Sequence, residues 1–138
     1  MKSAKWMLPV MLFLMSGLMV AQSLTSSHVV AQVPFDFMVS NKIIPAGECV
    51  VQAVDGNILA IRNFDARKSA LVTSSRSGAS NGDSTVLVFK RYGSQYFLSE
   101  IRLEGSSLTY RLPQSRAEAE MRAQNVPASQ QILLASLQ

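Results

Sequence analysis

The apolar pattern is strongest over residues 85–103, where two runs rich in β-branched and aromatic side chains flank Gly93 and Ser94. Such runs around a two-residue turn predict a β-hairpin, with glycine where the turn needs a positive φ. An even-length turn predicts these pairs: Tyr92 with Gln95, Arg91 with Tyr96, Phe89 with Leu98, Val88 with Ser99, and Val86 with Ile101. Both faces of the hairpin then carry apolar side chains. We therefore expect it in the middle of a sheet that is covered on both faces.

The residues before this hairpin predict four further strands. Residues 33–39 alternate between apolar and polar positions, as a half-buried strand does. Residues 48–54 and 58–64 predict a hairpin with a three-residue loop, and a charged tip separates it from a strand at 69–73. The predicted pairs are Val54 with Ile58, Ala53 with Leu59, Val51 with Ile61, Ile61 with Val72, and Asn63 with Ala70.

The remaining segments are more polar. Residues 74–84 contain no large apolar side chain and predict a long loop, and residues 108–112 predict a seventh strand. After Pro113, Ser115 and Glu118 form a capping box, in which the Ser115 hydroxyl accepts from the Glu118 N–H and the Glu118 carboxylate reaches back. The helix should run to about Gln124 and be mostly solvated, because its apolar stripe is thin.

These elements predict one mainly β domain, an antiparallel sandwich or partly closed barrel of about seven strands with a short C-terminal helix. The tail is compatible with a helical turn, a strand on the sheet or an exposed segment. The expected divisions are 1–23 (signal peptide), 24–32 (lead-in), 33–112 (β domain), 113–125 (helix) and 126–138 (tail).

The N-terminal segment has the features of a secretory signal peptide. Lys2 and Lys5 precede an almost continuously apolar run, and small residues follow it. Cleavage after Ser23 fits best, and cleavage after Ala31 is the alternative. An uncleaved signal anchor is less favoured, because the run is shorter than the roughly 20 apolar residues of a comfortable membrane span. We expect a chain exported to the periplasm or outside the cell, with membrane contact only before cleavage.

Net charge gives no argument for a nucleic-acid partner. The chain has 13 basic and 9 acidic residues, a formal charge of +4. Loss of residues 1–23 removes two lysines and leaves 11 basic against 9 acidic residues, or +2. Nucleic-acid binding usually needs a basic patch or stripe.

Few side chains suggest chemistry. His28 is the only histidine and Cys49 the only cysteine, so neither a Cys/His zinc site nor an intramolecular disulfide is expected. Cys49 falls on the inward face of its strand, where a buried thiol is expected rather than a reactive one. The sequence thus predicts no catalytic, cofactor-binding or metal-binding residue.

Among the acids, Glu100 is the most informative, because it lies in the apolar hairpin. A half-buried carboxylate needs a partner, and Arg91, Arg102 or Arg111 could provide one. Asp55 and Asp65 lie at predicted turn tips, where Asp bonds local backbone. The other acids considered as partners in a catalytic pair are Asp36, Glu48 and Glu104.

The hairpin also carries basic and aromatic side chains that could form a stacking platform for nucleic acid or sugar. They are Phe89, Lys90, Arg91, Tyr92, Tyr96 and Phe97. If both hairpin faces pack, the aromatic members belong to the core instead. Gly78, Gly82 and Gly93 are too scattered for a phosphate-binding loop.

Four segments resemble a family of small exported proteins of acidobacteria that has no assigned function. They are Val33-Pro-Phe-Asp-Phe37, Ile44-Pro-Ala-Gly-Glu48, Arg91-Tyr-Gly-Ser-Gln-Tyr-Phe-Leu-Ser99 and Leu112-Pro-Gln-Ser-Arg-Ala-Glu118. The resemblance spans residues 33–122. Cys49 departs from it, since an aromatic residue is more usual there. The resemblance implies export and carries over no catalytic residue.

We therefore expect a non-enzymatic exported module that binds an unknown protein or an envelope ligand, without a cofactor. The alternative is a small carboxylate-dependent hydrolase with Glu100 as its candidate acid. A second acid within about 10 Å of Glu100 in a cavity would favour that alternative. Arginines bound to Glu100 would argue against it.

Overall fold

The computed structural model describes residues 28–78, 82–105 and 108–138. The predicted signal peptide, residues 1–23, lies outside these ranges. The described chain is mainly β, with twelve strands and one short helix. The strands form two open sheets, which is consistent with a sandwich. The predicted fold class is therefore confirmed, although the number of strands is higher than the seven expected.

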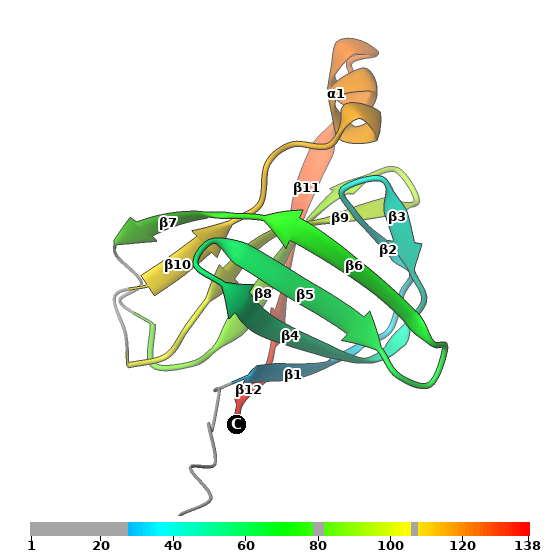
Figure 1. Cartoon of the computed structure of the whole chain (residues 1–138). Coiled ribbons are helices and arrows are strands. Elements are labelled where there is room, and N and C mark those ends of the chain that lie inside the picture. The colour runs from blue at the N-terminus through cyan, green and yellow to red at the C-terminus, as the bar shows by residue number, and fades with distance from the viewer. Residues whose placement is uncertain (1–27, 79–81, 106–107) are drawn as a thin grey trace, which may run out of the picture.

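Sheet A has five strands (Figure 1). Their order is β12 (Ser136–Leu137), β1 (His28–Val33), β4 (Gly47–Asp55), β5 (Ile58–Asn63) and β6 (Lys68–Thr73). Sheet B has seven strands. Five of them lie in the order β11 (Ala128–Leu134), β8 (Val86–Tyr92), β9 (Gln95–Arg102), β10 (Leu108–Arg111) and β7 (Ser75–Gly78). The other two are β2 (Phe37–Val39), which pairs with β9, and β3 (Lys42–Ile44), which pairs with β2. Helix α1 (Arg116–Ala123) lies at one end of the molecule, and the C-terminus lies beside β1 at the other.

The first strand differs from the prediction in both position and length. The segment at 24–32, expected as a lead-in that becomes the first strand, is already strand from His28, where β1 begins and pairs with β4 along its whole length. The continuous strand predicted at 33–39 is wrong: Val33 ends β1 in sheet A and Phe37 begins β2 in sheet B. Pro34 between them has no N–H for a ladder, and the Asp36 carboxylate accepts from the Ala46 N–H at 2.8 Å. The chain therefore changes sheets here.

The predicted inward residues of β4, β5 and β6 are buried except Ala53, which is exposed, and two pairings differ. Ala53 pairs with Leu59 and Val51 with Ile61, as predicted. Asp55, rather than Val54, lies opposite Ile58, because the ladder shifts at this point. In β6, Ala70 lies opposite Ile61 and Val72 opposite Leu59, two residues from the predicted register. A shift of two residues leaves the same side chains facing the core.

The β8–β9 hairpin is the centre of sheet B. Tyr92 lies opposite Gln95 and Phe89 opposite Leu98, as predicted, with Gly93 at a φ of 62°. Beyond this point a β-bulge shifts the register, and the predicted partners of Val88 and Val86 are wrong. The observed pairs are Val88 with Glu100, Leu87 with Ile101, and Val86 with Arg102. Ser99 is the extra residue, and its presence turns Ile101 toward the core.

The core lies between the two sheets and combines aliphatic side chains with an aromatic cluster. The Phe35 ring stacks on Tyr96 with 3.7 Å between centroids, and meets Phe89 edge-on at 5.0 Å. Phe37 contacts Phe89 from another side, at 5.1 Å. The large buried side chains of the core are Val29, Val33, Phe37, Val39, Ile44, Val51, Leu59, Ile61, Val72, Leu87, Phe89, Leu98 and Ile101.

Two further segments form edge strands: one was predicted as a loop, and the other is the tail, for which a strand was one alternative. Part of the loop predicted at 74–84 is β7, which pairs with β10. The tail forms β11 against β8 and then crosses to sheet A as β12 against β1. The tail therefore forms strands, which is one of the alternatives considered for it.

Helix α1 begins as predicted and docks differently. The Ser115 side chain accepts from the Glu118 N–H at 3.1 Å. The Glu118 carboxylate does not make the predicted return bond. Instead it is buried, accepts a hydrogen bond from the Tyr92 hydroxyl, and lies 3.9 Å from Lys90 Nζ. This contact attaches the otherwise exposed helix to the hairpin.

Candidate functional site

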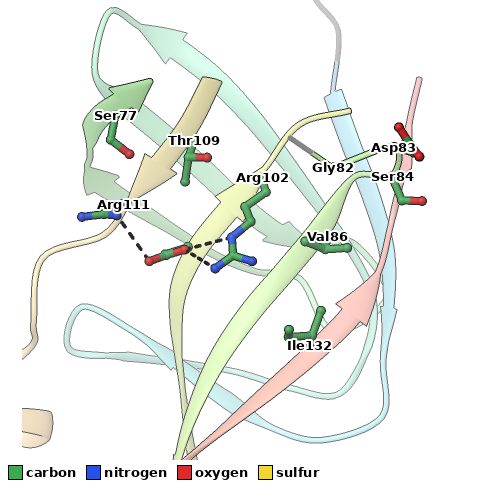
Figure 2. A pocket seen from close by; sticks show the side chains of 10 residues that line it. Ser77, Gly82, Asp83, Ser84, Val86, Arg102, Thr109, Arg111 and Ile132 are labelled. Carbon is green, nitrogen blue, oxygen red and sulfur yellow. Dashed lines mark hydrogen bonds and ion pairs between the residues drawn. The ribbon is translucent and has the colours of Figure 1, made fainter. Parts of the chain in front are cut away.

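The outer face of sheet B carries a pocket of about 390 Å³ (Figure 2). Strands β7, β8, β9, β10 and β11 contribute to it, so it crosses the whole sheet. Cross-strand pairing explains which side chains meet there: Arg111 lies opposite Glu100, and Thr109 lies between Arg102 and Ser77. The pocket is lined by Ser77, Gly82, Asp83, Ser84, Val86, Glu100, Arg102, Thr109, Arg111 and Ile132.

Glu100 is held by two arginines inside this pocket. Arg102 Nε and Nη2 both lie 3.1 Å from Glu100 Oε2. Arg111 Nε lies 3.6 Å from the other oxygen, Oε1. The Glu100 side chain is one-fifth exposed (20%), and that of Arg111 is 61% exposed. The predicted pairing of Glu100 with arginine is therefore correct for Arg102 and Arg111.

Arg91, the third arginine considered, does not reach Glu100. Its Nε donates to the Gly93 carbonyl at 2.7 Å, and its guanidinium lies 5.5 Å from the centre of the Tyr96 ring. Arg91 and Tyr96 are opposite residues of the hairpin, on the face away from the pocket. The strand alternation thus separates Arg91 from the charged pocket.

The bulge at Ser99 determines the character of the pocket. In an unbulged ladder Ser99 would lie opposite Val88, and Glu100 would turn toward the core. With the extra residue, Glu100 and Arg102 share the outer face with Arg111 and Thr109. The bulge therefore puts the charges in solvent and Ile101 in the core.

Thr109 is the one polar side chain of the pocket that is buried without a partner. Its side-chain oxygen makes no hydrogen bond in the described part of the structure, and the residue is only 4% exposed. Buried polar groups are paired in the great majority of proteins. The oxygen itself is enclosed, so a bound group can satisfy it only if the Thr109 side chain turns toward the pocket.

The other candidate residues are dispersed. His28 lies in β1 of sheet A. Asp55 ends β4 and Asp65 lies in the β5–β6 turn, both exposed as expected of turn acids. Glu48 accepts from the Gln32 side chain at 3.3 Å on the outer face of sheet A, and Glu104 is exposed after β9.

Cys49 is buried on the inner face of β4, as predicted. Burial, and to a smaller extent the Glu48 carboxylate, raises the pKa of its thiol from 9.0 to about 11. The thiolate is the reactive form of cysteine. This environment therefore suits an inert core thiol.

The hairpin aromatics do not form an open stacking platform. Phe89, Tyr92 and Phe97 are buried, and the last two meet edge-on at 5.7 Å between centroids. Tyr96 is partly exposed, but Phe35 already stacks on it. The expectation that these rings belong to the core is confirmed.

The four segments of the family resemblance contact one another. Phe35 stacks on Tyr96, which joins the first segment to the third. Leu112 N–H donates to the Ser99 carbonyl at 2.9 Å, which joins the third to the fourth. The Asp36–Ala46 bond joins the first to the second. Packing and turn formation explain these residues without any catalytic role.

Sequence reasoning missed Thr109, Ser77 and Asp83 as pocket residues. A signal for Thr109 exists, since alternation along residues 108–111 puts Thr109 and Arg111 on the face opposite Tyr110. Ser77 and Asp83 carry no such signal, because they lie in a segment without apolar periodicity. The place of Ser77 depends on the pairing of β7 with β10, and Asp83 lies in the segment before β8.

No group of three or more metal-ligating side chains occurs among the described residues. Within the same ranges, no helix has the length and apolar character needed to cross a membrane. Comparisons with protein-family models, curated proteins and solved structures found no significant match to this chain.

Proposed function

We propose that this chain is an exported, non-enzymatic β module that binds a ligand or partner in the cell envelope or outside the cell. The observation that carries the proposal is the pairing of Glu100 with Arg102 and Arg111 inside an open pocket. Binding sites commonly combine a concave surface with a few fixed polar groups. Here the arginines are held in place by Glu100, and Arg111 also faces solvent.

The same pairing argues against the hydrolase alternative. A glycosidase-like mechanism needs one carboxylic acid to donate a proton and a second to act as base or nucleophile. Both oxygens of Glu100 are already engaged by guanidinium groups. Asp83 lines the same pocket but belongs to an exposed segment before β8. These contacts favour a structural carboxylate that orients the two arginines.

Export is supported by the sequence of residues 1–23 and by the resemblance to exported acidobacterial proteins. Cleavage after Ala31 would remove most of β1, including the buried Val29 and Ala31. Cleavage after Ser23 leaves β1 whole. The test is to express the full-length chain in a bacterium and measure the mass of the product in each cell fraction. An intact chain retained with the cytosol or membranes would contradict export.

The binding function is tested with matched arginine variants. The exported wild type, Arg111→Gln and the control Arg62→Gln are immobilised and incubated with envelope extract and culture medium. Arg62 is exposed on the outer face of sheet A, so its substitution makes the same chemical change far from the pocket. We expect a component that the wild type and Arg62→Gln retain and Arg111→Gln releases, identified by mass spectrometry.

Two results would overturn this function. The first is equal retention of every component by all three proteins. The second is turnover of a glycan panel by the wild type that Glu100→Gln abolishes, since this would make Glu100 a catalytic residue. Unfolding curves for each variant show that the loss is not caused by misfolding.

A further inference from the structure

We propose that the pocket on the outer face of sheet B binds a small amphiphilic monocarboxylate. This inference rests on the proposed binding function and names its ligand class. Arg102 and Arg111 bind the carboxylate, Thr109 adds a hydroxyl, and Val86 and Ile132 contact the hydrocarbon chain. Three independent features of the pocket carry the assignment: its charge, its unpaired hydroxyl and its apolar end.

The arginines of the pocket favour a ligand with a single negative group. The four charged side chains that line the pocket are Arg102, Arg111, Glu100 and Asp83, and their charges cancel, so a more highly charged anion meets no excess of positive charge. A guanidinium has five N–H donors in a planar fork that matches a carboxylate. Arg111 approaches Glu100 through Nε at 3.6 Å, and its side chain is 61% exposed, so its guanidinium is open to solvent or a ligand. A dianion would meet Asp83 and Glu100 with less positive charge to offset it.

Thr109 supplies the second feature. It is 4% exposed, its Oγ1 has no partner among the described residues, and it lies directly opposite Arg102. Because Oγ1 itself is enclosed, the Thr109 side chain must turn toward the pocket before its hydroxyl can donate to a carboxylate oxygen that the neighbouring guanidinium also binds. A ligand at this position therefore removes an unsatisfied group from the wall of the pocket.

The third feature is the apolar end of the pocket. Val86 and Ile132 line it from β8 and β11, while Glu100, Arg102 and Arg111 come from β9 and β10 and Asp83 from the segment before β8. Arg111 and Ile132 lie on opposite sides of the pocket in Figure 2. Ile132 is half exposed, and the neighbouring Leu134 on the same face of β11 is 75% exposed. A chain that covers these residues buries apolar surface that now contacts water.

The pocket volume of about 390 Å³ lies toward the lower end of the 300–1,000 Å³ typical of small-molecule sites. This size suits a carboxylate with a short hydrocarbon chain. Octanoate is a suitable probe, acetate tests the carboxylate alone, and octanol tests the chain alone. Inorganic phosphate tests preference for a more highly charged anion.

The experiment measures the binding of these four probes to the exported protein by titration calorimetry. We expect octanoate to bind more tightly than acetate, octanol or phosphate. Arg111→Gln should weaken octanoate binding by about tenfold or more, because it removes charge-assisted hydrogen bonds. Thr109→Val should also weaken it. Arg62→Gln should leave the affinity unchanged.

A second pair of variants tests the contribution of the ligand's hydrocarbon chain separately from that of its carboxylate. Ile132→Ser should weaken octanoate and leave acetate unchanged, because only octanoate reaches the apolar end. Leu71→Ser is the control, since Leu71 is 66% exposed on the outer face of sheet A. The proposal is overturned if octanol binds as tightly as octanoate, if phosphate binds most tightly, or if Arg62→Gln weakens binding as much as Arg111→Gln.

Failure of this inference differs from failure of the proposed function. If octanoate does not bind but a component of the extract is retained in an Arg111-dependent way, the ligand class is wrong and the binding function stands. If no component shows that dependence and Glu100-dependent turnover is found, both are wrong.

Discussion

The Tyr92 hydroxyl donates a hydrogen bond to Oε1 of Glu118 across 3.0 Å, and this bond joins α1 to the centre of sheet B. Tyr92 is 2% and Glu118 5% exposed, although the rest of the helix faces solvent. Lys90 and Arg122 are the nearby cations, the first 3.9 Å from the carboxylate. The position of the helix thus depends on a buried polar contact rather than on an apolar stripe.

The first prediction concerns stability at high pH. Burial, followed by the Glu118 hydrogen bond and charge, raises the pKa of Tyr92 above its ordinary value of 10.0, while Arg122 lowers it. The folded protein therefore holds the phenol proton more tightly than the unfolded chain does. The resulting stabilisation is present below about pH 10 and is lost as the pH rises through the folded-state pKa.

Tyr92→Phe removes this ionisable group. Cys49, whose thiol also has a high pKa, is present in both proteins and so does not distinguish them. At about pH 8 the substitution should cost about 1 to 3 kcal/mol, because Glu118 loses a buried donor. Above about pH 10 the difference between the two proteins should shrink. Urea unfolding of both proteins from about pH 8 to above about pH 10 measures this difference in stability. A difference that stays constant or grows with pH would contradict the prediction.

The second prediction tests whether the β8–β9 hairpin is the centre of the core. Phe89 is fully buried between Phe35 and Phe37, and Leu98 is its cross-strand partner. Phe89→Ala and Leu98→Ala should each cost about 2 to 5 kcal/mol, the range for large core truncations. Leu71→Ala, at a 66% exposed position, should cost about 0.5 kcal/mol or less. Losses below about 1 kcal/mol at both core positions, measured by denaturant unfolding, would show that the centre lies elsewhere.

Alternation of apolar residues was enough to predict the mainly β class and the inward faces of most strands. It succeeded because side chains repeat every two residues, so register errors of two residues do not change the face, as at Ala70 and Val72. It failed at Ser99, where one extra residue reverses the face of Glu100 and Ile101. A bulge depends on the partner strand, so the local pattern does not specify it.

The same limit explains the missed strands and most of the missed site. Residues 75–78 lie at the edge of sheet B, where no apolar alternation is required, and their propensities suggest a loop. The pairing of Glu100 with arginine could be predicted because a half-buried charge needs a partner. That Ser77 lies beside Thr109 follows only from the pairing of β7 with β10, and Asp83 comes from the segment before β8.

The third prediction concerns the Cys49 thiol. With its pKa raised to about 11 by burial and by Glu48, about one thiol in a thousand is ionised at pH 8 in the folded protein. A thiol reagent should therefore modify the native protein far more slowly than the urea-unfolded chain. The colour released by an aromatic disulfide reagent measures both rates, with Cys49→Ala as the blank. Rapid and complete modification of the native protein would contradict burial.

The last prediction compares two buried threonines, Thr109 in β10 and Thr85 directly before β8. Thr109 Oγ1 has no partner in the described structure, whereas Thr85 Oγ1 accepts from the Glu104 N–H at 3.1 Å. Substitution of an unpaired buried hydroxyl by a methyl group removes a desolvation cost, and substitution of a paired one leaves its partner unsatisfied.

Thr109→Val should therefore stabilise the ligand-free protein by about 1 kcal/mol, and Thr85→Val should destabilise it by about 1 to 2 kcal/mol. Both values come from urea unfolding at neutral pH without added ligand. If Thr109→Val destabilises the protein as much as Thr85→Val does, then the Thr109 hydroxyl is satisfied in the free state and is not reserved for a ligand. If it stabilises the protein and also weakens octanoate binding, residue 109 carries a stability cost that the bound carboxylate relieves.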